Sequence, residues 1–108
     1  MATEDRPIDA LRDHLATIAA AGGTVTYEQL RAELGLEGDL VPVLRALSEA
    51  EDDAGRGLLT AVVVRADTGR PGAGWFRLAE SRGRAISDAE RTWAEERALL
   101  RRVHGRAP

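Results

Sequence analysis

The chain has 108 residues, a formal net charge of −3 and fifteen basic residues, all of them arginine. This length suits one domain and leaves little room for a deep active-site cleft. The absence of cysteine excludes disulfides and thiolate metal sites. The first residues are acidic where a secretory signal is basic, and no apolar run approaches the roughly 20 residues of a membrane span. We therefore expect a cytoplasmic protein without a membrane segment.

The charge is divided unevenly between the two halves of the chain. Residues 1–54 carry four arginines against twelve acids, a charge of −8, whereas residues 55–108 carry eleven arginines against six acids, a charge of +5. Such asymmetry indicates either binding to a polyelectrolyte or self-association. Two ordinary solvated faces would give the same totals, and the sequence leaves that interpretation open.

Three helices are predicted in the first half. Residues 1–6 are expected to be flexible, and Pro7 fits the first turn of a helix that Gly22-Gly23 terminates. The apolar stripe of this helix is Ile8, Leu11, Leu15 and Ile18. Thr26 and Gln29 then have the spacing of a capping box, which predicts a second helix over about 26–34. A short strand at Thr24-Val25 is compatible with this order.

The third helix follows after a very tight connection. Gly35 ends the second helix, and Gly38-Asp39 caps a third that reaches about Asp52. Its buried stripe is Leu40, Val43, Leu44 and Leu47. A short connection containing glycine is typical of a helix-turn-helix.

After residue 57 the pattern changes from helical to extended. Residues 58–66 are rich in valine and predict a strand, and residues 75–79 predict a second strand. The glycines and proline of residues 67–74 predict a turn between them. Trp75 and Phe76 would then point to opposite faces of the second strand.

A last helix is expected from the capping pair Ser87 and Glu90 to Gly105. The predicted fold class is therefore α+β, in the order α-α-α-β-wing-β with an additional C-terminal helix. Residues 7–80 form the winged-helix domain in this prediction, and residues 81–108 form the C-terminal helix and a basic tail.

This pattern resembles the winged helix-turn-helix superfamily, as found in small bacterial proteins. The resemblance is carried by Thr26-Tyr27-Glu28-Gln29-Leu30, Leu34-Gly35-Leu36, residues 58–64 and Gly72-Ala73-Gly74-Trp75-Phe76. It implies DNA binding as the commonest role, with the second helix of the motif in the major groove, although other winged helices bind proteins. The start of the second helix is also similar to alkylguanine alkyltransferase-like domains, but their reactive cysteine has no counterpart here.

No residues form a catalytic or metal-binding motif, so we expect no enzyme activity, no cofactor and no metal. His14 and His104 lack metal-ligand spacing, and no serine lies in an activating motif. The acids at 49–53 are interpreted as a solvated helix end, because they lack the pattern of a calcium loop. The glycine-rich segment 69–74 leads into a predicted strand, unlike a phosphate-binding loop.

The sequence favours a regulatory DNA-binding protein. Its third helix is acidic, so the attraction to phosphate would come from the wing and the arginines that follow. The predicted DNA-binding residues are Arg45, Arg65, Arg70, Arg77, Arg82 and Arg84. The alternative is a winged-helix protein-interaction module, self-associating or docking to a partner protein, with no DNA binding.

The last helix also predicts a homodimer. Its apolar residues need burial, either against the first helix of the same chain or against a second chain. Antiparallel pairing would bring Arg97, Arg101 and Arg102 opposite Glu90, Glu95 and Glu96, which favours the second solution. The predicted dimer interface is Trp93, Arg97, Leu100 and Val103.

Overall fold

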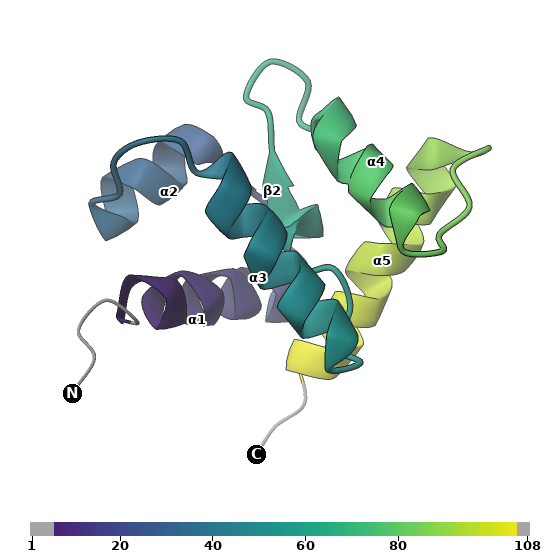
Figure 1. Cartoon of the computed structure of the whole chain (residues 1–108), viewed down its shortest axis with the longest axis horizontal. Coiled ribbons are helices and arrows are strands. Elements are labelled where there is room, and N and C mark those ends of the chain that lie inside the picture. The colour runs from purple at the N-terminus through teal and green to yellow at the C-terminus, as the bar shows by residue number, and fades with distance from the viewer. Residues whose placement is uncertain (1–5, 106–108) are drawn as a thin grey trace.

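The computed structural model describes residues 6–105, and five α-helices surround a very small sheet (Figure 1). The predicted flexible segment 1–6 therefore lies outside the described residues except for Arg6, and so does the end of the basic tail. The elements in chain order are α1 (Arg6–Ala20), β1 (Val25–Thr26), α2 (Tyr27–Leu34), α3 (Val41–Asp53), the 3-10 helix η2 (Leu59–Val62), β2 (Val63–Val64), α4 (Ala73–Ser81) and α5 (Ala89–His104).

The three helices predicted in the first half are present. The capping box of α2 is confirmed, because Thr26 Oγ1 accepts from the Gln29 amide at 3.1 Å and Gln29 Oε1 accepts from the Thr26 amide at 2.9 Å. Gly35 ends α2 in the left-handed conformation, with φ +63°. The start of α3 differs slightly from the prediction: Leu40 is its cap residue, and Asp39 Oδ1 accepts from the Val41 amide.

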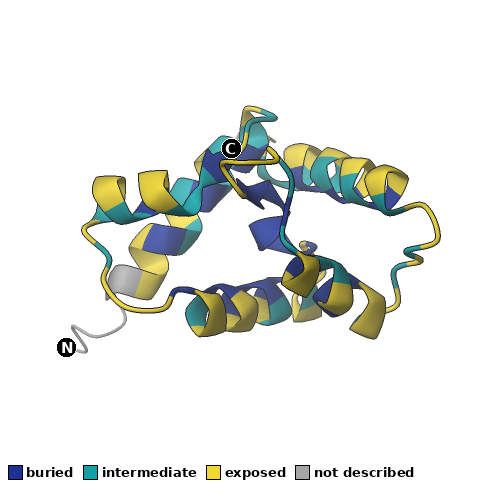
Figure 2. Cartoon of the chain, turned by 90° about the horizontal axis from the view of Figure 1, so that it is seen from above, coloured by how far each residue is buried: buried dark blue, intermediate teal, exposed yellow. Residues whose placement is uncertain are grey.

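The strand predicted over residues 58–66 is mostly wrong. Leu59–Val62 form η2, and only Val63–Val64 are extended. They pair with β1 in parallel register, Val25 with Val63 and Thr26 with Val64. Every residue from 57 to 64 is buried, and Figure 2 shows buried backbone at the centre of the molecule. A run that is apolar on all sides lacks the alternation of a half-buried strand, so the pattern left its conformation open.

The second predicted strand is also wrong, because residues 75–79 lie within α4. Trp75, Leu78 and Ala79 are its buried residues, and their i, i+3, i+4 spacing is helical. Trp75 and Phe76 do not point to opposite faces of a strand; their rings meet edge to face with centroids 5.1 Å apart. The antiparallel hairpin of a wing is therefore absent from residues 58–79, and the turn at 67–72 joins β2 to α4 instead.

The last helix belongs to the same core as the rest of the chain. Helix α5 packs on α1 and η2, and Leu100 is fully buried in the same apolar cluster as Leu11, Leu15 and Leu58. Asp88 caps α5 by accepting from the Arg91 amide, in place of the predicted Ser87 and Glu90 pair. The fold is thus α+β, with five helices and a two-stranded parallel sheet in the described residues. Within that range, no helix is long and apolar enough to cross a membrane.

Candidate functional site

The arginines predicted to contact DNA are nearly all paired with carboxylates of the same chain. Five of the six lie within 4.0 Å of an acidic side chain, and only Arg77 has no such partner in residues 6–105. The pairs are Arg45–Glu49, Arg65–Asp67, Arg70–Glu90, Arg82–Asp52 and Arg84–Asp52. These pairs compensate most of the positive charge predicted for DNA binding.

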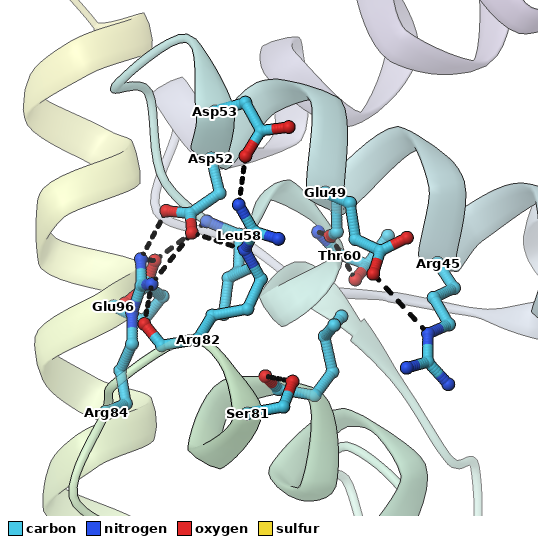
Figure 3. Close-up of polar contacts among 12 residues, drawn as sticks. Arg45, Glu49, Asp52, Asp53, Leu58, Thr60, Ser81, Arg82, Arg84 and Glu96 are labelled. Atoms are coloured by element: carbon cyan, nitrogen blue, oxygen red, sulfur yellow. Dashed lines mark hydrogen bonds and ion pairs between the residues drawn. The ribbon is translucent and has the colours of Figure 1, made fainter.

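The strongest of these contacts form a cluster between α3, α5 and the loop after α4 (Figure 3). Arg84 donates to both oxygens of Asp52, at 2.7 and 3.0 Å, and to both oxygens of Glu96, at 2.9 and 3.0 Å. Glu96 Oε2 also accepts from the Leu58 amide at 2.7 Å. Arg82 bridges Asp52 and Asp53. The cluster therefore ties four segments of the chain together.

The cluster shifts the pKa values of Asp52 and Arg84. Hydrogen bonds from Arg84, and then from Arg82, hold the pKa of Asp52 below its ordinary value despite partial burial. The hydrogen bond to Asp52, followed by those to Glu96, raises the pKa of Arg84. Both groups are therefore ionised across the physiological range.

The sequence predicts a solvated acidic end of α3, and this is wrong for Glu51 and Asp52, whereas Asp53 is exposed. Glu51 is only 2% exposed, and Arg56 donates to both of its oxygens. These bonds lower the pKa of Glu51. Its partner arginine lies five residues away across the loop after α3, a distance over which sequence alone gives no pairing rule.

The predicted dimer-interface residues are largely used within the chain. Leu100 is 0% exposed, so it is not available to a second chain in this structure. Trp93 is half-buried, and its indole nitrogen donates to the Ala61 carbonyl at 2.8 Å. The guanidinium of Arg97 lies over the Trp93 ring, 4.9 Å from its centroid. The sequence allowed the last helix to bury its apolar residues against the first helix of the same chain or against a second chain. In the structure, α5 packs against α1 of the same chain.

One concave surface gathers three arginines that have no ion-pair partner within residues 6–105. A groove of about 600 Å³ lies between the C-terminal ends of α1 and α5. We call it the α1–α5 groove; its lining residues are Ala19, Gly22, Gly23, Val62, Ala94, Arg97, Ala98, Arg101, Arg102 and Gly105. No carboxylate is among them. The sequence had placed its three arginines at a dimer interface, so their meeting with Gly22 at the end of α1 was missed.

Two of the groove arginines lie against one glycine. Arg97 Nη2 donates to the Gly22 carbonyl at 3.1 Å, while its Nε is buried without a hydrogen-bond partner. A Cβ at Gly22 would lie 3.5 Å from Nη1 of Arg101. Arg97 and Arg101 therefore both lie against Gly22, whose φ of +73° favours glycine at this position.

The remaining polar residues do not suggest chemistry. Ser48 and Thr60 share a buried hydrogen bond of 2.6 Å between their hydroxyls, and Ser48 Oγ also accepts from the Thr60 amide. His14 Nε2 lies 3.5 Å from Glu33 Oε1. His104 lies 90 residues further along the chain, and burial lowers its pKa. Residues 6–105 contain no group of three His, Cys, Asp or Glu side chains placed to hold a metal.

Comparison of the chain with family models, curated proteins and solved structures finds no match to any of them. The function must therefore be inferred from the residues and their geometry.

Proposed function

We propose that the chain is a non-enzymatic interaction domain that binds an acidic segment of a partner protein in the α1–α5 groove. One observation carries this proposal. Five of the six arginines expected to contact DNA are paired with carboxylates, whereas Arg97, Arg101 and Arg102 share a groove and have no carboxylate partner among residues 6–105. A short acidic segment would supply the missing counter-charge.

The charge distribution favours a protein segment over a duplex. DNA-binding proteins with strong electrostatic affinity make about 6–10 phosphate contacts. Here three arginines face the groove, and the chain as a whole is negative. Recruiting Arg84 to phosphate would break its bonds to Asp52 and Glu96, which would leave Glu96 without an arginine partner and Asp52 with Arg82 alone.

Of the predicted winged helix, only the order of the helix-turn-helix is supported by the structure. Helices α2 and α3, joined through Gly35, follow one another in the order of a helix-turn-helix. The exposed face of α3 carries Arg45, already paired with Glu49 at 3.7 Å. Without a hairpin beside it, α3 has no wing to extend its contact with a duplex. DNA binding by a regulatory protein stays a prediction, and this geometry gives it less support than the groove gives to protein binding.

Fluorescence anisotropy with two labelled probes tests the proposal. One probe is a short peptide of alternating glutamate and glycine, and the other is a random DNA duplex. We expect the peptide to bind, and the double variant Arg101→Gln/Arg102→Gln to weaken its binding about tenfold or more, as the loss of two charge-assisted contacts implies. The matched control is Arg65→Gln/Arg70→Gln, which removes two arginines outside the groove and should leave peptide affinity unchanged.

The same probes and variants also give the results that would contradict the proposal. Binding of the duplex at about 50 mM salt that falls steeply with salt would indicate phosphate contacts. If the Arg65→Gln/Arg70→Gln variant abolished that binding while the groove variant retained it, the DNA-binding hypothesis would replace ours. Equal peptide binding by both variants would also contradict the groove as the site.

A further inference from the structure

The α1–α5 groove holds a surplus of positive charge whose size can be estimated. Its three arginines contribute +3. The groove also receives the C-terminal ends of α1 and α5, and each helix C-terminus carries about −0.5 of an elementary charge. About +2 is left uncompensated by residues 6–105. A single carboxylate would neutralise only half of it, whereas a phosphate monoester carries about −1.5 to −2 at neutral pH.

One of the three arginine side chains, Arg97, is held in place before any ligand arrives, whereas Arg101 and Arg102 are exposed. Arg97 is fixed by its stacking on Trp93 and by its bond to the Gly22 carbonyl. Arg101 packs over the same glycine. Two guanidinium groups held near one another repel, and an anion between them would relieve that repulsion. Held side chains also lose less freedom on binding than mobile ones do.

Arg97 also keeps one unused donor, and the floor of the groove allows close approach. Arg97 Nε is buried and has no acceptor, which leaves one donor of its planar fork unsatisfied. The floor is formed by Ala19, Gly22, Val62 and Ala98, none of which has a large side chain. Guanidinium forks match the paired oxygens of a phosphate group.

From these observations we infer that the α1–α5 groove is a phosphoryl-binding site, in which Arg97, Arg101 and Arg102 receive a phosphorylated side chain of the partner. This inference rests on the proposed function, because it names the chemistry of the acidic segment. A phosphorylated serine or threonine supplies two negative charges on one tetrahedral group, which fits a compact groove better than carboxylates spread along a chain.

A nuclear magnetic resonance titration of the full chain tests the inference. The probes are three: inorganic phosphate, a short glycine-alanine peptide with one central phosphoserine, and the same peptide with glutamate in that position. Trp93 and Trp75 are the only tryptophans, so one indole N–H signal reports on the ring that Arg97 covers and the other reports on the core. We expect the phosphoserine peptide to move the Trp93 signal and to bind about tenfold tighter than the glutamate peptide. Inorganic phosphate should move the same signal more weakly.

Variants and pH sharpen the test. Arg101→Gln/Arg102→Gln should reduce phosphopeptide affinity about tenfold, whereas Arg77→Gln, an exposed arginine on α4, should not change it. Phosphopeptide affinity should also fall as pH decreases through about 6, the second pKa of a phosphate monoester, while glutamate-peptide affinity should not.

The outcomes separate the two proposals. Equal affinity for the phosphoserine and glutamate peptides, both lost in the groove variant, would overturn the phosphoryl inference and leave the proposed function intact. Binding of inorganic phosphate without either peptide would identify a small-molecule site and overturn both. No movement of the Trp93 signal with any probe would also overturn both. A phosphopeptide shift that persists in Arg101→Gln/Arg102→Gln would place the site elsewhere.

Discussion

Arg84 and Asp52 are separated by 32 residues and joined by two hydrogen bonds, from Nη2 to Oδ1 at 2.7 Å and from Nη1 to Oδ2 at 3.0 Å. The contact links the loop after α4 to the end of α3. Both side chains are mostly withdrawn from water, with 21% and 15% of their surfaces exposed. Such a fork is directional and only weakly screened by salt, unlike an exposed ion pair.

The substitution Asp52→Asn should therefore destabilise the chain measurably. The amide keeps the shape of the carboxylate but loses its charge and one acceptor, leaving Arg84 and Arg82 with weaker partners. We expect a loss of about 1.5–3 kcal/mol in the free energy of unfolding, the range for hydrogen bonds to charged groups. Urea unfolding monitored by circular dichroism measures it.

Glu49→Gln is the matched control for this substitution. It changes another carboxylate of α3 to an amide, but its pair with Arg45 is 3.7 Å long and largely exposed. Exposed helix pairs contribute about 0.5 kcal/mol or less. Equal losses in the two variants would show that the Arg84 fork adds nothing beyond a surface ion pair.

The dependence of stability on pH follows from the lowered pKa values of Asp52 and Glu51. A carboxyl whose pKa is lower in the folded state stabilises the fold above its unfolded value, here 3.8 for Asp52 and 4.5 for Glu51, and that contribution is lost as the pH falls through the folded value. We expect the free energy of unfolding to decrease as the solution is acidified below about pH 4.5.

The variant Asp52→Asn isolates the contribution of Asp52 to the pH dependence of the free energy of unfolding. The stability difference between the wild-type chain and the variant should be largest near neutral pH and should shrink on acidification, because protonated Asp52 has also lost its charge. Denaturant unfolding at several pH values supplies the comparison. A difference that stays constant down to about pH 2.5 would contradict the lowered pKa of Asp52.

The helices of the first half were predictable because local chemistry specifies them. Thr26 and Gln29 complete a capping box, and Gly35 terminates α2, whatever lies around them. The second half was mispredicted where burial on all sides removed the periodic signal, as in residues 58–64. For α4 the signal was present: the spacing of Trp75, Leu78 and Ala79 is helical, and the expected hairpin obscured it.

The candidate site was less predictable than the fold. Counting charges located an acidic and a basic half, but it could not indicate that Arg84 pairs with Asp52 and Glu96. Those contacts depend on how α3 and α5 approach each other, which no short-range pattern encodes. The α1–α5 groove could not be predicted from short-range patterns either, because Gly22 and Arg97 meet in it although they are 75 residues apart.

Two glycine-to-alanine substitutions should change stability in opposite directions. Gly57 has φ +90°, and a Cβ there would lie 3.0 Å from Glu96 Oε2 and from Leu99 Cδ2. Gly57→Ala combines backbone strain with crowding beside the Arg84 cluster, and we expect it to cost about 1–3 kcal/mol. Thermal unfolding should show a lower Tm.

Gly74→Ala is its counterpart. Gly74 lies in the first turn of α4, has no positive φ, and a Cβ there meets nothing within 4 Å. Alanine restricts the unfolded chain and favours the helix, so we expect a gain of up to about 1 kcal/mol. A lower Tm for Gly74→Ala, or an unchanged Tm for Gly57→Ala, would disagree with the backbone described here.

Leu100→Ala tests whether α5 is part of the core. Leu100 is fully buried against residues of the first half of the chain, so its truncation leaves a cavity. A loss of about 2–5 kcal/mol is expected for such a substitution. Val103→Ala on the same helix removes a half-buried side chain and should cost about 1 kcal/mol or less. If Leu100→Ala and Val103→Ala both caused only small losses of stability, α5 would not be packed on the core in solution.

The packing of α5 within its own chain also bears on the oligomeric state. The sequence predicted a homodimer because the apolar stripe of this helix needed burial. In the structure Leu100 is buried within its own chain, Trp93 donates to the Ala61 carbonyl, and Arg97 donates to the Gly22 carbonyl. Much of the apolar area that was expected to drive association is thereby removed from water, and pairing two α5 helices through Leu100 would require their separation from α1. We therefore expect sedimentation equilibrium to give 11.6 kDa, the mass of one chain, over a wide range of protein concentrations. A mass of twice that value, lost in Val103→Arg but retained in Arg77→Gln, would instead support the homodimer and place its contact on the exposed edge of α5.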